Sequence, residues 1–154
     1  MSATATRAQL WFLDSLVTIR VSSDEGSDEI SVLENFSPRG GSPPLHVHHT
    51  EDEIFHILEG QLRFRVSDEE LRLGAGQTLL APKGVPHTYI VESERARWLV
   101  NTAHGDFERF VRSFSRPAER DELPEPSPPT PEQAEALAAA CREHGIDLVG
   151  PPLH

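Results

Sequence analysis

The chain has 154 residues, enough for one domain that buries a hydrophobic core without help from disulfides. Apolar residues make up 37% of the chain and charged residues 25%, which is a globular composition. Acidic residues number 25 against 14 basic ones, and the formal net charge of −11 argues against nucleic acid and anionic membranes as partners.

The sequence also bears on the compartment. Its single cysteine, Cys141, cannot form an internal disulfide, so nothing indicates an oxidising environment. The first eight residues are polar and lack the apolar segment of a signal peptide, and no run is long enough to span a bilayer. We therefore expect a cytoplasmic protein.

Short strands separated by turns are predicted from Leu10 to about Asn101. The expected strands cover residues 16–21, 30–36, 54–58, 62–66, 71–73, 78–80, 88–91 and 97–100. Within 62–66 every second residue is apolar, which predicts one buried and one solvent-exposed face. Gly60 lies where a tight hairpin needs a permissive backbone. Many short strands at regular spacing predict an all-β sandwich or barrel.

Helical patterns follow the strands. We expect Asp106 to be the N-cap of a helix with an apolar face that covers an open edge or end of the barrel. That face consists of Phe107, Phe110, Val111 and Phe114. A second helix is predicted to start with Thr130 as N-cap, Pro131 at the first position and Gln133 completing a capping box. Gly145 should end it.

The expected organisation has four parts. Residues 1–9 form a disordered segment or N-terminal arm, and residues 10–115 form the barrel with its covering helix. Residues 116–131 hold six of the 13 prolines and many acidic residues, so they are expected to be an extended linker. Residues 132–154 form the C-terminal helix and tail, in which residues 146–149 are expected to add a strand, across a dimer interface.

Three histidines and one glutamate form a candidate metal site. His46 and His48 are two residues apart, so on a strand both side chains point to the same side. Glu53 opens the next strand, from which its carboxylate can turn back to this pair. His87 follows the rigid turn of residues 82–86, in which two prolines flank a glycine. The set offers three nitrogen ligands and one oxygen ligand.

Two blocks of fixed spacing contain these candidate ligands. The first block is Gly40, His46-x-His48, Glu53 and Gly60, and the second is Gly76, Pro82-x-Gly84 and His87. Together they resemble the two signature motifs of the cupin superfamily, over about residues 10–115. The resemblance implies a double-stranded β-helix, the cupin jelly roll, with the ligands pointing inward. Val91 departs from the family pattern, which usually has asparagine at this place.

Within the cupins, the chain resembles small single-domain bacterial quercetin 2,3-dioxygenase-like proteins. The resembling segments are residues 43–48, 53–60 and 10–13, and the Phe107 helix with its proline-rich tail. The resemblance implies metal-dependent dioxygenase chemistry in which O₂ opens a flavonol ring. His56 stands where tyrosine is expected, but by strand parity it faces away from the metal.

A three-histidine, one-glutamate set suits one divalent transition metal ion per chain: Fe, Mn, Co, Ni, Cu or Zn. Glu53 is the ligand best able to act also as a catalytic base. By strand parity Phe55, Phe64 and Tyr89 line the interior and are candidates for a substrate pocket that takes an aromatic or enolisable small molecule. The alternatives are a histidine cluster without metal and aromatic residues that only pack in the core.

Other functions remain open on the same barrel. One is a metal-dependent isomerase, cyclase or lyase in which the ion polarises a carbonyl group, and another is a small-molecule-binding cupin without turnover. A homodimer is expected from the resemblance and from an exposed edge strand. The remaining histidines are expected to lie in exposed or outward positions: His49, His56, His104, His144 and His154.

Overall fold

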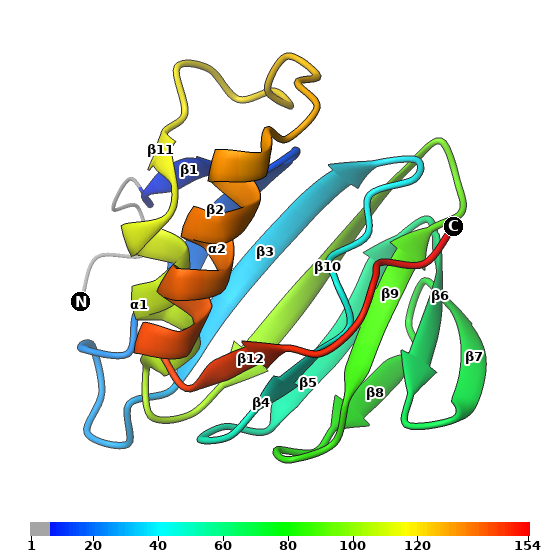
Figure 1. Ribbon diagram of the computed structural model, residues 1–154. Coiled ribbons are helices and arrows are strands. Elements are labelled where there is room, and N and C mark those ends of the chain that lie inside the picture. The colour runs from blue at the N-terminus through cyan, green and yellow to red at the C-terminus, as the bar shows by residue number, and fades with distance from the viewer. Residues whose placement is uncertain (1–6) are drawn as a thin grey trace.

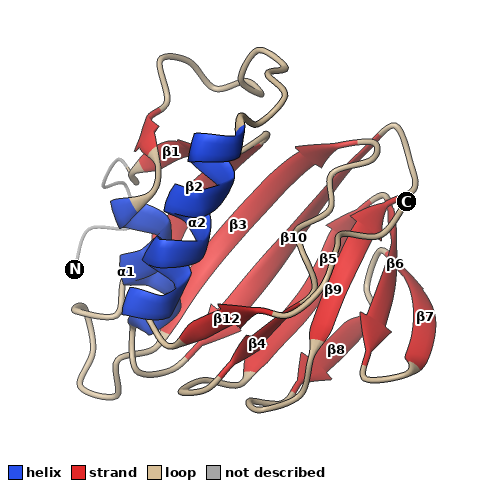
Figure 2. Cartoon of the chain, in the orientation of Figure 1, coloured by secondary structure: helices blue, strands red, loops and turns tan. Residues whose placement is uncertain are grey.

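Two antiparallel β-sheets face each other, and two helices lie side by side at one end of the molecule (Figures 1 and 2). The computed structural model describes residues 7–154. The first sheet has the strand order β11-β1-β2-β3-β10-β5-β8, and the second has the order β12-β4-β9-β6-β7. This is the expected all-β architecture, a jelly-roll barrel with C-terminal helices.

The strands of the first sheet are β1 (Gln9–Phe12), β2 (Ser15–Val21), β3 (Ser31–Pro38), β5 (Glu53–Glu59), β8 (Thr78–Ala81), β10 (Arg95–Thr102) and β11 (Arg116–Pro117). Those of the second are β4 (His46–His48), β6 (Gln61–Val66), β7 (Glu69–Gly74), β9 (His87–Val91) and β12 (Ile146–Leu148). Every predicted strand is present, with ends that differ by a few residues. Of the expected N-terminal arm, residues 1–6 lie outside the described residues, and β1 begins at Gln9.

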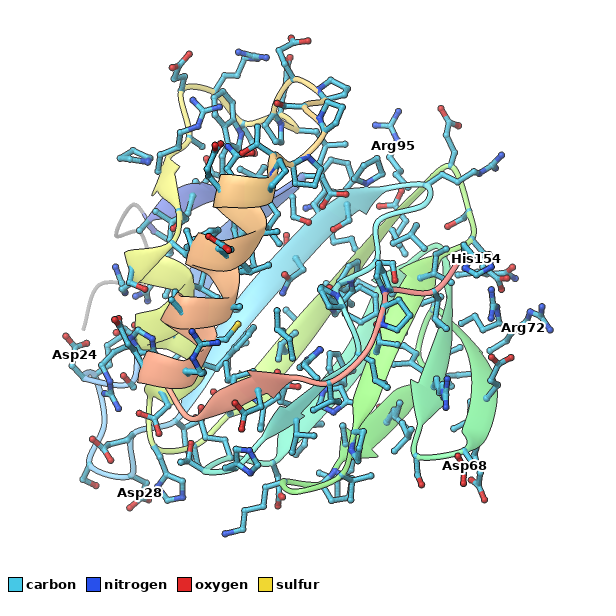
Figure 3. All side chains as sticks on the ribbon, in the orientation of Figure 1. Asp24, Asp28, Asp68, Arg72, Arg95 and His154 are labelled. Atoms are coloured by element: carbon cyan, nitrogen blue, oxygen red, sulfur yellow. The ribbon has the colours of Figure 1, made fainter. Side chains whose placement is uncertain are left out.

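The main core lies between the two sheets. Apolar side chains at every second position of the facing strands form one buried cluster, as the period of two predicts. Its largest fully buried members are Ile57, Leu62, Phe64 and Trp98. Charged side chains labelled in Figure 3, such as Asp68 and Arg72, lie instead at the periphery.

The hairpin between β5 and β6 depends on Gly60. Its φ of 87° lies in the left-handed region, and a Cβ there would lie 2.5 Å from the carbonyl oxygen of Arg95. Both the conformation and the lack of space require glycine at this position, as predicted.

The first helix, α1 (Asp106–Ser113), begins differently from the prediction. Its N-cap is Gly105, which has a φ of 77°, and Asp106 is the first helical residue. A left-handed backbone favours glycine at the cap. The Asp106 carboxylate instead accepts hydrogen bonds from Thr50 Oγ1 at 2.7 Å and from Arg109 at 2.7 Å. A negative charge in the first turn also interacts favourably with the helix dipole.

The second helix, α2 (Pro131–Glu143), begins with the predicted capping box. The Thr130 hydroxyl accepts from the Gln133 amide, and the Gln133 side chain accepts from the Thr130 amide. Both helices pack on the inner face of β2 and β3, where Phe110, Val111 and Cys141 join one buried cluster. The predicted role of the first helix, to cover an end of the barrel, is therefore confirmed. Neither helix is long and apolar enough to cross a bilayer, within residues 7–154.

The C-terminal segment, residues 116–154, returns to the barrel. The proline-rich stretch starts at β11, which pairs with β1, and the guanidinium groups of Arg116 and Arg120 lie over the Trp11 ring. At the end of the chain, β12 pairs with β4 of the same chain. The expected extra strand is present, but its placement across a dimer interface is wrong, because α2 delivers it to the free edge of β4.

Candidate metal centre

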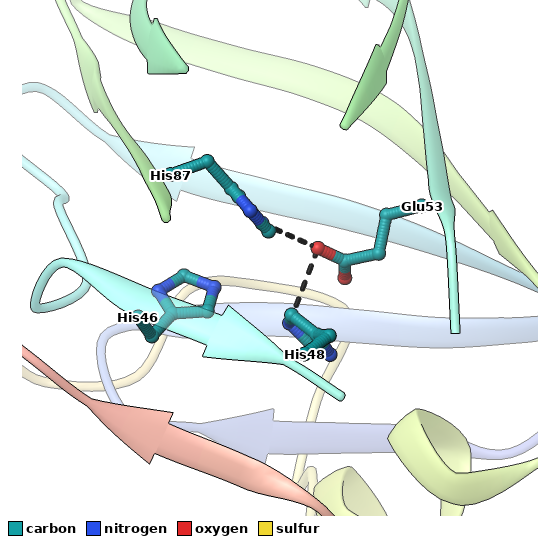
Figure 4. Close-up of side chains that lie close together, drawn as sticks. All are labelled: His46, His48, Glu53 and His87. Carbon is teal, nitrogen blue, oxygen red and sulfur yellow. Dashed lines mark hydrogen bonds and ion pairs between the residues drawn. The ribbon is translucent and has the colours of Figure 1, made fainter. Parts of the chain in front are cut away.

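Four side chains from three strands converge inside the barrel (Figure 4). His46 and His48 come from β4, Glu53 from the start of β5 and His87 from the start of β9. One ligand atom from each lies within 4.8 Å of all the others. His48, Glu53 and His87 expose 2% or less of their surface. We call these four residues the His₃Glu cluster, and the expected convergence is confirmed.

Glu53 lies at the middle of this cluster. Its Oε2 accepts a hydrogen bond from His87 Nε2 at 2.6 Å and lies 3.2 Å from His48 Nε2. The His46 ring meets that of His87 edge-on, at an interplanar angle of 60° and a centroid distance of 4.5 Å. The register explains these contacts, because His46 pairs directly with His87 across β4 and β9.

Backbone carbonyls orient two of the imidazoles. Pro44 O lies 2.7 Å from His46 Nδ1, and Val85 O lies 3.3 Å from His87 Nδ1. A carbonyl can only accept, so both Nδ1 atoms carry a hydrogen and the Nε2 atoms are left to face the cluster. Such an outer hydrogen bond is typical of metal-binding histidines.

The buried Nε2 of His48 has no hydrogen-bond partner among the residues that the structure describes. Its 3.2 Å approach to Glu53 therefore does not satisfy it as a hydrogen bond does. A buried polar atom without a partner is unfavourable unless something else satisfies it. A cation at the centre of the cluster fits this need, since an unprotonated imidazole nitrogen is a metal ligand.

The pKa shifts of these side chains also favour the binding of a cation. Burial and the neighbouring histidines lower the pKa of His46 to about 3, and burial lowers the pKa of His48. Burial opposes ionisation of Glu53, but the charges of His48 and His87 and the hydrogen bond from His87 outweigh it and lower its pKa to about 2. Burial opposes protonation of His87, but the hydrogen bond to Glu53 and the Glu53 charge outweigh it and raise the pKa of His87. A metal ion would take the place of the proton on His87 Nε2, and unprotonated imidazoles around a carboxylate are the donor set that a divalent transition metal needs. The cluster could therefore hold a metal ion.

A second buried carboxylate supports the cluster from outside. Glu51 Oε1 accepts the Phe107 amide at 2.6 Å, in the first turn of α1, while burial raises the Glu51 pKa to about 7. This bond helps to place the Phe107 ring, which meets the His48 ring edge-on at 5.6 Å. The covering helix thus touches the candidate metal site directly.

A cavity opens from the cluster toward the helices. It offers about 90 Å³ to the centre of a water molecule, and His46, His48 and Glu53 form part of its wall. Phe55 and Tyr89 also line it, as expected of pocket residues. Phe64 does not: it lies behind them, with ring centroids 5.0 Å from Phe55 and 5.6 Å from Tyr89.

Sequence reasoning missed part of this wall. Asn35 and Ser37 of β3 supply polar groups, and Cys141 and Ile146 reach the cavity from the C-terminal segment. Strand parity gave a signal for Asn35, since it lies on the same side of β3 as the buried Leu33. No local pattern indicated the C-terminal residues, because their position depends on how α2 packs.

The other histidines lie outside the cluster. His49 is exposed and pairs with Asp147, and His56 bonds Thr78 on the outer side of β5. His104 and His154 are exposed, as expected. His144 is half-buried, contrary to the expectation, because its Nδ1 bonds the Ala140 carbonyl at 2.8 Å and its ring lies near Phe110.

The position of Val91 is filled without a polar side chain. Val91 is buried, and its amide donates to Gly41 O while its carbonyl accepts from the Gly40 amide, each at 3.0 Å. Backbone hydrogen bonds alone thus hold Gly40 and Gly41 against β9.

Comparison with known proteins agrees with this architecture. Residues 32–101 match the family model described as "Cupin domain". Quercetin 2,3-dioxygenase of Bacillus subtilis is 26% identical over 109 residues, which cover 71% of this chain and 32% of that protein. The chain thus aligns with about a third of the length of this relative.

Two solved structures show the same fold. The polyketide cyclase RemF from Streptomyces resistomycificus superposes with a TM-score of 0.57 and 20% identity, over 67% of this chain and 80% of that one. An RmlC-like cupin from Shewanella frigidimarina gives 0.56 and 14%, over 65% and 88%. The two sheets, the converging His₃Glu cluster and the family match agree: residues 32–101 match a cupin domain, and the chain has the cupin fold.

Proposed function

We propose that the chain is a metal-dependent oxygenase, of the dioxygenase type, that acts on an aromatic or enolisable small molecule such as a flavonol. One observation carries this proposal: three imidazoles and one carboxylate converge within 4.8 Å, and two of the imidazoles and the carboxylate lie in the wall of a largely apolar cavity. The resemblance to quercetin 2,3-dioxygenase supports the choice of reaction, although it covers only a third of that protein.

His46, His48, Glu53 and His87 would hold the ion. When bound, a divalent transition metal supplies a Lewis-acidic centre that binds and acidifies an enol or catechol hydroxyl and, if redox-active, exchanges electrons with O₂. Donor type alone does not choose among Fe, Mn, Co, Ni, Cu and Zn.

The protein's own groups would position the substrate and take up its proton. Oε2 of the Glu53 carboxylate points at the histidines. The other oxygen, Oε1, can therefore accept the proton of an acidified substrate hydroxyl. Phe107 beside His48, with Phe55 and Tyr89 further along the cavity, would exclude water and contact the faces and edges of an aromatic ring.

Oxygen uptake tests this function. The metal-free protein is reconstituted separately with Fe, Mn, Co, Ni, Cu and Zn, and an oxygen electrode follows O₂ uptake with quercetin as substrate. A dioxygenase places both atoms of O₂ in its products, so we expect one O₂ consumed per quercetin with at least one ion. If none of the reconstituted forms consumes O₂ with quercetin or other enolic and catecholic substrates, the oxygenase function is wrong.

A non-oxidative reaction is the second candidate. The same donors can polarise a carbonyl group without O₂, and the fold is shared with a protein described as a polyketide cyclase. Conversion of an enolisable substrate by the metal-loaded protein under nitrogen, with no change in its oxidation level, would favour an isomerase, cyclase or lyase. Binding without conversion in air or nitrogen would favour the non-catalytic module.

A further inference from the structure

Within residues 7–154, two buried hydrogen-bond donors have no partner, one on a residue of the cavity wall and one on a residue behind that wall. Asn35 is 7% exposed and lines the cavity, and Trp98 is fully buried. Neither Asn35 Nδ2 nor Trp98 Nε1 has a hydrogen-bond partner within residues 7–154. Buried donors are nearly always paired in folded proteins, so each unpaired one calls for an acceptor.

The residues that carry these two donors are neighbours on adjacent strands of the barrel. Asn35 on β3 and Trp98 on β10 are direct register partners, so their side chains lie next to each other across the sheet. The next inward-facing side chain of β3 is satisfied, because Ser37 Oγ lies 2.5 Å from Ser15 Oγ. Two adjacent donors without acceptors, one of them on a residue of the cavity wall, are suited to bind a ligand oxygen.

We propose that Asn35 and Trp98 form a specificity site that binds a hydroxyl or carbonyl oxygen at the far end of the aromatic substrate. This assignment rests on the proposed function, since it takes the ligand to be an aromatic molecule bound at the His₃Glu cluster. It adds a second anchor, which distinguishes substrates by an oxygen that does not reach the metal.

The register gives the length of such a molecule. Trp98 pairs with Ile57 on β5, and Glu53 lies four residues before Ile57 on the same strand. At ~3.4 Å per residue, the two sites are offset on the order of 13 Å along the sheet. A small acid or a single enol cannot span this offset, whereas a molecule of two or three rings can.

The wall between the two sites is aromatic. Phe55 and Tyr89 line the cavity with ring centroids 6.2 Å apart, and the Tyr89 ring meets that of Trp98 edge-on at 5.1 Å. A flat ring can lie against such a wall, with one oxygen at its remote end directed to the two donors. The combination selects a polycyclic phenol or ketone over a purely hydrocarbon ligand of the same size.

Two flavonols test the site by binding alone. Quercetin and 3-hydroxyflavone share the hydroxy-ketone unit that would bind the metal, but only quercetin carries hydroxyl groups on its outer rings. Isothermal titration of the zinc-loaded full chain under nitrogen gives both affinities without turnover. We expect quercetin to bind the wild type more tightly, and Asn35→Leu to weaken quercetin about tenfold while 3-hydroxyflavone changes less than about twofold.

Two further variants keep the test decisive. Trp98→Phe removes the other donor but keeps a ring beside Tyr89, so it should weaken quercetin in the same selective way. Ser31→Ala is the matched control, because Ser31 is a buried polar residue on the same face of β3, bonds Thr102 and lies outside the cavity. It should leave both affinities unchanged, and thermal unfolding confirms that each variant is folded.

The possible outcomes separate this site from the function it rests on. Equal weakening of both flavonols, no weakening, or no binding of either by the wild type overturns the specificity site. If Asn35→Leu leaves quercetin binding intact while the reconstituted protein consumes O₂, only the site is wrong. If quercetin binding depends on Asn35 but no O₂ is consumed, the site stands and the oxygenase function is wrong.

Discussion

The two strands that carry most of the His₃Glu cluster differ in their support. Strand β5, with Glu53, has seven residues and is paired along its length between β10 and β8. Strand β4, with His46 and His48, has three residues and a single register pair with β9. Its other edge has three pairs with β12, near the end of the chain. Glu53 thus lies on a strand that is paired on both sides, whereas the strand of His46 and His48, half of the candidate metal site, depends on the C-terminal segment.

The tail reinforces this dependence beyond β12. The Val149 amide donates to Leu45 O at 2.8 Å, the Leu45 amide donates to Pro151 O at 3.2 Å, and the Leu153 amide donates to Ser42 Oγ at 3.0 Å. These bonds fix the chain that leads into β4. We therefore expect metal affinity to respond to changes in the C-terminal segment that leave the barrel intact, and the predictions below test this from the largest effect to the smallest.

The largest effect is expected from a ligand on the weakly paired strand. His48→Ala removes one of three imidazoles and should abolish most metal binding, measured by elemental analysis after reconstitution. His56→Ala is the control, because this histidine lies on the outer side of β5 and bonds Thr78 Oγ1 at 2.7 Å. Full metal content in His48→Ala would contradict the ligand assignment.

A matched pair of isoleucines tests the comparison directly. Ile146 in β12 and Ile57 in β5 are both buried, so each change to alanine should lower the free energy of unfolding by about 2–5 kcal/mol. We expect only Ile146→Ala to weaken metal binding, by roughly tenfold, because it loosens the partner of β4. Chemical denaturation gives the stability, and competition with a chelator gives the metal affinity.

The opposite result would be as informative. If both variants lose the same metal affinity, the cluster responds to the stability of the whole barrel, and the C-terminal segment has no special role. If neither loses affinity while both are destabilised, the ligands are positioned by β9 and the turn after β4 alone.

The β5–β6 hairpin is attached to the well-paired strand β5. Changes there should lower the stability of the protein without changing its metal affinity. Gly60→Ala combines a left-handed φ with a contact of 2.5 Å to Arg95 O, whereas Gly76→Ala has a similar φ of 85° in open space. Gly76→Ala should cost about 1–2 kcal/mol for the backbone alone, and Gly60→Ala about 1–3 kcal/mol more. Metal affinity should not change in either folded variant, and equal unfolding midpoints would show that the β5–β6 turn can relax.

The same division explains what the sequence could predict. Strand parity and fixed spacing are local patterns, so they found the long strands and all four residues of the cluster. The pairing of β12 with β4 arises only when α2 packs against α1, and three residues carry too little pattern to reveal it. The helix start at Gly105 and the burial of His144 likewise depend on tertiary contacts. Asn35 was predictable as inward-facing, but its missing partner is a property of the folded barrel.

The smallest and most local effect concerns Cys141, which reports on the C-terminal segment itself. Cys141 is buried on α2, and burial raises its thiol pKa to about 11. At pH 8 roughly one such thiol in a thousand is ionised, so a thiol reagent should label the folded protein very slowly. Labelling followed by mass spectrometry measures this rate against the rate of the unfolded chain.

The pH dependence of labelling tells how the thiol becomes reachable. If α2 and β12 open before reaction, the exposed thiol has an ordinary pKa near 8.5, and the rate should rise tenfold per pH unit and level off above that value. Reaction of the buried thiol would instead continue to rise toward pH 11. We expect the first profile, with an opening free energy below that of global unfolding and faster labelling in Ile146→Ala but not in Ile57→Ala. An opening free energy equal to that of global unfolding would show that the C-terminal segment and the barrel unfold as one unit, and that β4 is as firmly held as β5.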